Sequence, residues 1–278
     1  MARMSASRPW SAADAAALLR VPTAADDKYS RGVVGLRTGS DAYPGAAVLG
    51  VEAAWRTGVG MVRYLGPRRA ADLVLQRRPE TVTADGRVQA WVVGSGTSPD
   101  ERRDEETAAV RAILAGELPV VVDAGALDLV DRSEHGGARA PLVLTPHDRE
   151  HAALRRRLGL AERNDRGASA VETAAATGAV VLLKGGTTLV ATPEGDLVSV
   201  ATGVGWLATA GTGDVLAGIL GALLAANPGE PAAAAATAAW LHGRAGAAAS
   251  RAHAGGPLVA LDVAHAVASV VGELISPD

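Results

Sequence analysis

Apolar runs of strand length recur along the chain, and segments with helical spacing follow most of them. Runs that are apolar throughout, without alternating polar residues, are typical of strands buried on both faces of a parallel sheet. The pattern therefore predicts an α/β fold in which helices cover both faces of a central, mostly parallel sheet. The expected strands span residues 33–36, 61–65, 90–93, 118–122, 142–144 and 180–183.

The rest of the pattern predicts one hairpin and several helices. Residues 187–202 are typical of two short strands joined by a turn at Pro193-Glu194-Gly195. The chain then enters a glycine-rich loop and closes with alanine-rich helical segments. The expected helices span residues 11–19, with Ser11 as the cap, 45–57, 101–114, 215–224, 231–250 and 258–273.

The glycine-rich loop leads directly into an apolar helix. Residues 210–214 are Ala-Gly-Thr-Gly-Asp; Gly211 and Gly213 let a ligand approach the backbone, and the first N–H groups of a helix favour an anion. Asp214 would then lie beside a bound phosphate, where its carboxylate could take a proton from a hydroxyl group. The loop therefore indicates phosphoryl transfer, with a simple helix cap as the alternative interpretation of Asp214.

The strand ends carry the other candidate residues, because ligands of parallel sheets bind at the carboxyl ends of the strands. Lys184 follows a strand and precedes two glycines, and Lys28 is the only other lysine, which favours a phosphate contact for Lys184. His147 either binds a ligand or is an ordinary surface histidine. Asp123 either orients a metal-bound water or the backbone, or it caps a helix. Two loops of small residues extend the same rim, at 39–47 and 94–97.

Composition narrows the choice of partners. The 278 residues are 48% hydrophobic with a formal net charge of −3, so charge gives no reason to expect nucleic acid or a membrane surface as a partner. Cysteine is absent, which excludes thiolate chemistry and is compatible with the cytoplasmic location that we expect. We expect neither a signal peptide nor a membrane span, because no apolar run is long enough.

The histidines at 242, 253 and 265 lack metal-ligand spacing, so we expect them to be structural.

Six motifs, taken in order, are similar to those of a known family. They are GSDAYPGAA from 39, VVGSGTS from 92, VVDAGAL from 121, LTPHDRE from 144, LLKGGTT from 182 and ATAGTGDVLAGILGALL from 208. Over about residues 28–250 the chain resembles the bacterial branch of the ADP-dependent NAD(P)H-hydrate dehydratase family. The resemblance implies a ribokinase-like fold, a three-layer sandwich of helices, sheet and helices.

The resemblance also implies a reaction. The family removes water from hydrated NADH or NADPH, a damaged form of the coenzyme, and its bacterial branch consumes ADP and releases AMP and phosphate. We expect ADP to serve better than ATP, and Mg²⁺ to bridge the phosphates. Asp214 would act as the general base on the hydroxyl of the hydrate, and the helix N-terminus would hold the transferred phosphoryl group.

The family's site residues transfer to this chain motif by motif. Asp214 would be catalytic, and no metal ligand is identified. The hydrated dinucleotide would contact Ala46, Gly96, His147 and Asp214. The adenine nucleotide would contact Lys184, Gly185, Gly186, Thr187, Thr188 and Gly213.

The chain departs from the family pattern just before the anion loop. Val204-Gly205-Trp206-Leu207 stands where the family commonly has Asn-Pro-Gly-Met, and Ala210 where it often has glycine. Many relatives carry an N-terminal epimerase domain; we expect residues 1–278 to form a single ribokinase-like domain without one. We also expect a homo-oligomer, such as a tetramer, because the alanine-rich helix at 231–250 offers little polar surface.

Two other functions are compatible with the same residues. A small-molecule kinase of this fold, such as a vitamin-precursor kinase, would use an anion loop and an aspartate equally well, and product analysis separates it from a dehydratase. A non-catalytic nucleotide-binding module is the second alternative, although Asp214 would then have no role. The residues do not distinguish NADH hydrate from NADPH hydrate as the preferred substrate.

Overall fold

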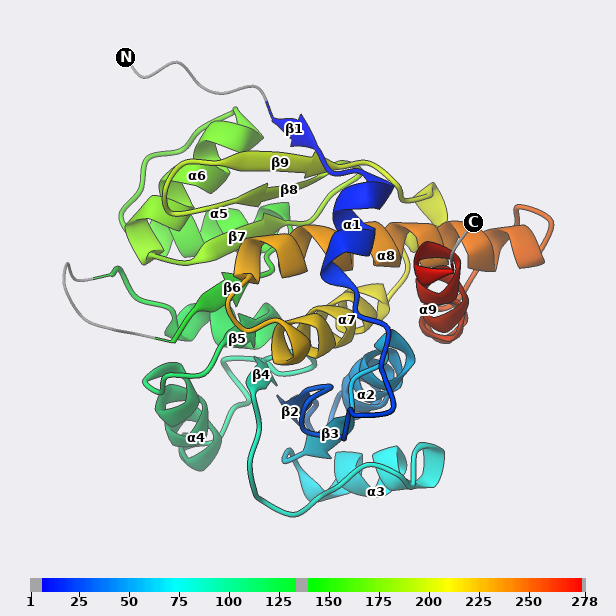
Figure 1. The fold of residues 1–278 in the computed structure, drawn as a ribbon. Coiled ribbons are helices and arrows are strands. Elements are labelled where there is room, and N and C mark those ends of the chain that lie inside the picture. Colours follow the sequence, from blue (N-terminus) through cyan, green and yellow to red (C-terminus); the bar gives the residue numbers. More distant parts are fainter. Residues whose placement is uncertain (1–6, 134–139, 277–278) are drawn as a thin grey trace.

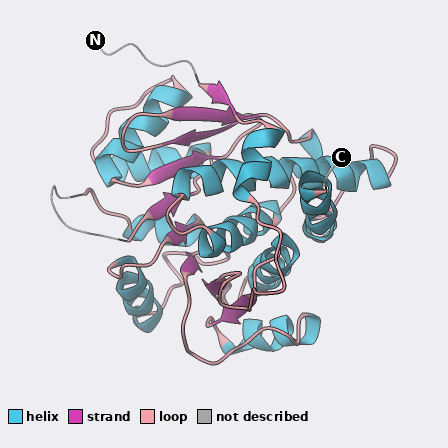
Figure 2. Cartoon of the chain, in the orientation of Figure 1, coloured by secondary structure: helices cyan, strands magenta, loops and turns pink. Residues whose placement is uncertain are grey.

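The computed structural model describes residues 7–133 and 140–276, which form one nine-stranded sheet with helices on both sides (Figures 1 and 2). The strand order is β1-β9-β8-β7-β6-β5-β4-β2-β3, and only β8 runs antiparallel to its neighbours. The expected mostly parallel sheet is confirmed. The strands are β1 Arg8–Pro9, β2 Val33–Arg37, β3 Met61–Tyr64, β4 Ala90–Val93, β5 Val120–Val122, β6 Leu142–Leu144, β7 Val180–Leu183, β8 Thr188–Ala191 and β9 Leu197–Val200.

The strands match the expected runs closely, and the differences have simple causes. β5 begins at Val120 and not at Leu118, because Pro119 has no N–H to donate to a ladder and Leu118 is exposed. The hairpin of β8 and β9 is confirmed. β1 was not expected; its two residues pair with residues of β9 that lie 190 positions away, and such a short segment carries no periodicity.

The helices cover both faces of the sheet, so the three-layer arrangement is confirmed (Figure 1). One layer holds α1, α2, α3, α7, α8 and α9, and the other holds α4, α5 and α6. The helices are α1 Ala12–Leu18, α2 Gly45–Thr57, α3 Arg68–Arg77, α4 Asp104–Leu114, α5 Asp148–Arg157, α6 Arg166–Thr177, α7 Thr212–Ala226, α8 Pro231–Ala252 and α9 Ala260–Ile275, with 3-10 turns η1 Ala124–Leu129 and η2 Gly205–Leu207.

Helix ends follow local chemistry. Ser11 caps α1 as expected, through a capping box with Asp14. α2 has the expected bounds and ends at Gly58, whose φ of 101° suits glycine. α4 begins at Asp104, three residues later than expected, because Arg103 is extended at the N-cap.

Side chains of the buried strands alternate between two cores. In β7, Leu182 packs in the core under α7 and α8, whereas Val181 and Leu183 pack in the core under α5 and α6. Both sets are buried, which explains why the sequence shows continuous apolar runs there.

Helices α2 and α7 pack in close contact, and this contact positions the site. A Cβ at Gly218 of α7 would overlap the carbonyl oxygen of Gly50 in α2. Only glycine therefore allows this approach. Gly50 also lies beside the backbone of Asp214, so the contact brings the first turns of α2 and α7 to the same edge of the sheet.

Helix α8 does not support an oligomer in the expected way. Most of its alanines are buried against α1, α7, α9 and the sheet. The alanine-rich composition of α8 therefore reflects packing inside this chain and gives no support for an oligomer. A homo-oligomer stays a prediction. Among the described residues, no helix is both long and apolar enough to cross a membrane.

Candidate active site

The expected site residues gather at the carboxyl ends of the parallel strands. Asp123 directly follows β5, Thr145 and His147 follow β6, and Lys184 follows β7. The order of β4, β5, β6 and β7 in the sheet makes these ends neighbours. The N-terminus of α7 reaches the same edge, because a Cβ at Gly213 would lie 3.7 Å from Lys184 Nζ.

Lys184 and Asp123 form a buried ion pair at the centre of this edge. Lys184 Nζ donates to Asp123 Oδ1 at 2.9 Å. Asp123 also accepts hydrogen bonds from Ser95 Oγ at 2.9 Å and from Thr145 Oγ1 at 2.8 Å. The Asp123 side chain makes no capping bond to η1, so the capping alternative is wrong. Asp123 instead fixes the position of the lysine.

Lys184 faces three carboxylates. Glu150 Oε2 lies 3.7 Å from Nζ, and Asp214 is close enough to interact electrostatically. Burial alone would lower the pKa of Lys184, but Asp123, Glu150 and Asp214 outweigh it and raise the pKa above its ordinary value. Lys184 therefore remains a cation that can meet a phosphate.

Asp214 lies half-buried in the first turn of α7, after the glycine loop. Gly211 takes a φ of 89° at the N-cap, a left-handed conformation that favours glycine. Burial raises the pKa of Asp214 to about 7, the negative charge of Asp123 adds to this rise, and Lys184 partly opposes it. A carboxyl group that titrates near neutral pH is suited to exchanging protons with a substrate.

His147 has a structural role that its motif did not predict. Its Nδ1 accepts from the N–H groups of Arg149 at 3.1 Å and Glu150 at 3.2 Å, and the Glu150 carboxylate accepts from His147 N at 2.8 Å. This is a capping box at the start of α5. With Nδ1 as an acceptor, the ring proton is on Nε2. The side chain is half exposed, at 51%, so substrate binding through Nε2 stays a prediction.

The residues Lys184–Thr188 form the turn between β7 and β8. Arg166, at the start of α6, holds this turn by donating to the carbonyl oxygens of Lys184 at 2.9 Å and Thr187 at 3.0 Å. Asp148 in turn accepts from Arg166 Nε at 2.9 Å. A Cβ at Gly185 would overlap the guanidinium group of Arg166, so a side chain there would require that group to move. The nucleotide contacts expected of Lys184, Gly185, Gly186, Thr187, Thr188 and Gly213 stay predictions.

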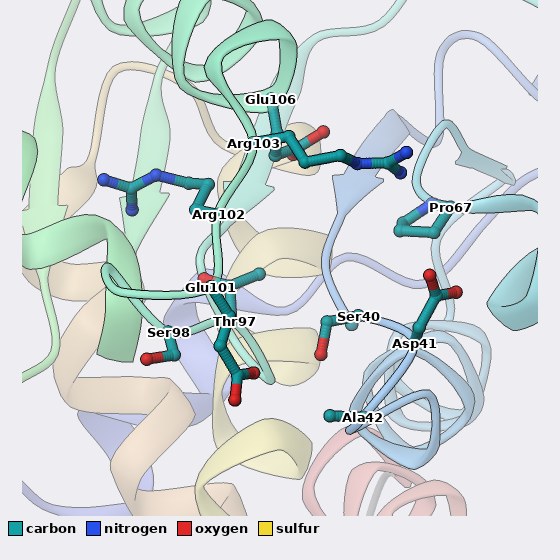
Figure 3. Close-up of a pocket in the computed structure, with 11 residues that line it drawn as sticks. Ser40, Asp41, Ala42, Pro67, Thr97, Ser98, Glu101, Arg102, Arg103 and Glu106 are labelled. Atoms are coloured by element: carbon teal, nitrogen blue, oxygen red, sulfur yellow. The ribbon is translucent and has the colours of Figure 1, made fainter.

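Ala46 and Gly96, both expected to contact the substrate, touch each other. A Cβ at Gly96 would overlap the Cβ of Ala46, and Gly96 has a φ of 66°. A pocket of about 240 Å³ lies next to them, between the loop after β2 and the segment before α4 (Figure 3). The loop contributes Gly39, Ser40, Asp41 and Ala42, the facing segment contributes Thr97, Ser98, Glu101, Arg102 and Arg103, and the first turn of α4 contributes Glu106, with Pro67 at one end.

Several residues that shape the site were not among those expected. They are Ser95, Thr145, Glu150 and Arg166. Ser95, Thr145 and Glu150 lie inside two of the motifs, so the motif positions could have indicated them. Arg166 lies outside every motif, and only the packing of α6 against the β7–β8 turn places it there.

His242 lies on α8 beside the backbone of Thr212, in the first turn of α7. Burial lowers the pKa of His242 to about 4, so the ring is neutral at neutral pH. Its Nε2 is buried and has no hydrogen-bond partner among the described residues. No contact assigns it a catalytic role, and the structural interpretation of this histidine stays as expected.

Carboxylates near Lys184 are the candidate ligands for a magnesium ion. Within residues 7–133 and 140–276, no three His, Cys, Asp or Glu side chains converge as metal ligands. Asp123 and Glu150 nevertheless face a single cationic group, Lys184 Nζ. Two carboxylates beside a phosphate site suit Mg²⁺, which is usually bound by one or two carboxylates together with substrate phosphates. The residues present therefore fit a magnesium ion that arrives with a nucleotide.

The geometry combines a glycine loop at the N-terminus of α7, a fixed cation at Lys184 and a carboxyl group at Asp214 that titrates near neutral pH. Residues 34–267 match the family described as NAD(P)H-hydrate dehydratase. The chain belongs to the NAD(P)H-hydrate dehydratase family. The match spans the sheet from β2 onward and includes every expected site residue.

Curated members of this dehydratase family share substantial identity with the chain. The bifunctional NAD(P)H-hydrate repair enzyme Nnr of Mycobacterium tuberculosis is 46% identical over 235 residues, which cover 81% of this chain and 48% of that protein. The chain therefore spans about half the length of that relative. The ADP-dependent (S)-NAD(P)H-hydrate dehydratase of Neisseria meningitidis is 39% identical over 237 residues, covering 78% of this chain and 77% of that protein.

Solved structures agree with the family and the fold. The ADP/ATP-dependent NAD(P)H-hydrate dehydratase of Bacillus subtilis, co-crystallised with ATP and Mg²⁺, superposes with a TM-score of 0.83 at 27% identity, covering 96% of this chain and 99% of that one. A ribokinase-like superfamily protein of Enterococcus faecalis superposes with a TM-score of 0.82 at 21% identity, covering 97% of each chain. The expected ribokinase-like fold is therefore confirmed.

Proposed function

We propose that this chain dehydrates hydrated NADH and NADPH at the expense of ADP, releasing NAD(P)H, AMP and phosphate. The observation that carries this proposal is Asp214: a carboxyl group with a pKa of about 7 at the N-terminus of α7, beside Lys184. Family membership supports the choice of substrate, because the N. meningitidis relative is an ADP-dependent (S)-NAD(P)H-hydrate dehydratase.

The chemistry proceeds in two stages. Asp214 takes the proton of the hydrate's hydroxyl group while its oxygen attacks the terminal phosphorus of ADP. The bond from that phosphorus to the bridging oxygen breaks, and AMP leaves. The lone pair of the ring nitrogen then expels the phosphate, and loss of a proton from the neighbouring ring carbon restores the dihydropyridine. Phosphorylation thereby replaces hydroxide, a poor leaving group, with phosphate.

Each charged group on the rim has a place in this scheme. The N–H groups of α7 and the Lys184 ammonium would hold the transferred phosphoryl group, whose negative charge they stabilise. Asp123 and Glu150 would hold Mg²⁺. When bound, that ion neutralises phosphate charge. Asp123 would also keep Lys184 in position through their 2.9 Å contact.

The test of the proposal is incubation of the chain with hydrated NADH, Mg²⁺ and ADP. We expect the reduced-nicotinamide absorbance to return in step with AMP release, and ADP to support faster turnover than ATP. A phosphorylated product that keeps its phosphate would indicate a small-molecule kinase. Nucleotide binding without any turnover would indicate a binding module.

The pH dependence follows from Asp214. The base must be ionised, and its pKa in the free protein is about 7. We therefore expect kcat/KM for the hydrate to rise with pH, to half its maximum near pH 7, and to level off above that value. Measurement at constant ionic strength across this range checks the result. A profile that is flat from about pH 5 to 9 would contradict the assignment.

Lys184→Ala is expected to weaken ADP binding by roughly 1–3 kcal/mol, the scale of a hydrogen bond to a charged group. Lys28→Ala is the matched control, because Lys28 is the only other lysine and lies over Tyr29, outside the rim. Calorimetric titration with ADP measures both variants. The phosphate role of Lys184 fails if its variant binds ADP as tightly as the control does.

Two further expectations belong to the proposal. A homo-oligomer such as a tetramer remains a prediction, which light scattering across a range of concentrations tests. A cytoplasmic location is proposed on the absence of cysteine and on the soluble dinucleotide substrate.

A further inference from the structure

The pocket between the loop after β2 and the segment before α4 adjoins two of the expected substrate contacts, Ala46 and Gly96 (Figure 3). Thr97, which follows Gly96, lines this pocket, and so does Gly39, whose Cα would lie 3.2 Å from a Cβ at Gly96. A ligand on Ala46 and Gly96 can therefore continue into the pocket. Its volume of about 240 Å³ is below the roughly 300–1,000 Å³ of a pocket for a whole small-molecule ligand, so it suits one part of a larger substrate.

Two charged residues of the lining already have partners. Arg102 donates to Asp128 at 2.7 Å; its side chain is only 5% exposed and points away from the pocket (Figure 3). Glu106 accepts from Arg37 Nη2 at 2.7 Å. These two residues therefore contribute little net charge to the pocket.

The other charged residues of the lining are Asp41, Glu101 and Arg103. All three are exposed, and none of them takes part in an ion pair within the described part of the chain. The side chains of Arg103 and Asp41 both extend toward the end of the pocket at Pro67 (Figure 3). Because the three side chains are exposed, a ligand can reach them. The pocket thus offers a guanidinium group, which suits a phosphate, together with carboxylates, which accept from hydroxyl groups.

We propose that this pocket binds the AMP half of the hydrated dinucleotide, an assignment that rests on the proposed function. Arg103 would donate to the phosphate, and Asp41 and Glu101 would accept from the ribose hydroxyl groups, as acidic residues do in other dinucleotide sites. The nicotinamide half would remain at the rim, with its hydroxyl group at Asp214. A free phosphate ion would meet repulsion from the two carboxylates, and an uncharged sugar would leave Arg103 without a partner.

The probes are NADH and reduced nicotinamide mononucleotide, NMNH, which lacks the AMP half, and calorimetric titration of the full chain measures their affinities. We expect NADH to bind at least about tenfold more tightly than NMNH. Hydrate turnover with equal affinities for NADH and NMNH would overturn the inference and leave the dehydratase proposal standing. Tighter binding of NADH than of NMNH without hydrate turnover would contradict the dehydratase proposal and leave the pocket assignment standing. Absence of saturable NADH binding up to about 10 mM would overturn the inference.

Variants locate the AMP half. Arg103→Gln should weaken NADH binding by about tenfold or more and leave NMNH binding within about twofold of the wild type. Ala42→Leu should do the same by filling space, with Arg103 intact; Ala42 lines the pocket and is exposed, so the longer side chain is tolerated. Arg68→Gln is the matched control, since Arg68 is also exposed and its pair with Asp72 lies outside the pocket. Equal NADH affinity in the wild type, Arg103→Gln and Ala42→Leu would overturn the assignment, as would equal losses of NADH and NMNH affinity.

Discussion

Asp214→Asn is expected to lose dehydration turnover by on the order of 10²-fold or more, with ADP binding largely retained. An amide cannot accept the proton that leaves the hydroxyl group as its oxygen attacks phosphorus. Asparagine keeps the size and the capping ability of aspartate. A residue that only caps α7 would therefore tolerate this substitution, whereas a general base would not.

The same variant is expected to be more stable than the wild type at alkaline pH. Asp214 has a pKa of about 7 in the folded protein, against an ordinary value of 3.8. The folded state therefore binds the proton more tightly, and wild-type stability falls as pH rises from about 4 to 7. Each unit corresponds to about 1.4 kcal/mol, so the advantage of the variant should reach roughly 2–4 kcal/mol above pH 7.

Both effects are measured on one preparation. Turnover is compared at saturating ADP and hydrate, so that a binding defect does not imitate lost chemistry, and urea unfolding is followed at pH 5 and pH 8. Near wild-type turnover by the folded variant would rule out Asp214 as the general base. If the variant and the wild type differ in stability by the same amount at pH 5 and at pH 8, burial does not raise the pKa of Asp214.

Asp123→Ala is expected to destabilise the protein by roughly 3 kcal/mol, because it leaves the Lys184 ammonium buried without its closest partner. The side chain of Lys184 is only 19% exposed, and Glu150 at 3.7 Å compensates in part. The hydroxyl groups of Ser95 and Thr145 lose their acceptor as well. The cost arises from groups left unsatisfied, since the net contribution of a buried ion pair is small.

The double variant Asp123→Ala/Lys184→Met serves as the control for this explanation. Removal of both charges leaves no buried ion without a partner, so we expect recovery of about 2 kcal/mol relative to Asp123→Ala alone. Urea unfolding of the two single variants and the double variant completes the cycle. If the single losses simply add in the double variant, the ion pair is not the source of the instability.

Asp123 also influences Asp214 from a distance. Its negative charge contributes to the raised pKa of Asp214, second to burial. Folded Asp123→Asn should therefore move the rise of the pH profile to lower pH, because the remaining base ionises more easily. Such a shift in the pH profile would show that the charge of Asp123 affects the pKa of Asp214 in solution.

Local patterns were enough to predict the architecture of this protein. Continuous apolar runs identified the buried strands, because a strand covered by helices on both faces must be apolar on both sides. The hairpin and the bounds of α2 followed from turn residues and helical spacing. The positions of Asp123, His147, Lys184 and Asp214 at strand and helix ends also followed, because ligands of parallel sheets bind at one edge.

The pairing and the electrostatics of those residues depended on the tertiary structure. Lys184 and Asp123 are 61 positions apart, and only the adjacency of β5, β6 and β7 brings them to 2.9 Å. The raised pKa of Asp214 requires burial and the nearby charge of Asp123, which no local pattern records. His147 caps α5, which its motif did not indicate, and its contact with the substrate stays a prediction. Periodicity reports which residues are buried and where elements end, whereas distances between side chains depend on strand order and helix packing.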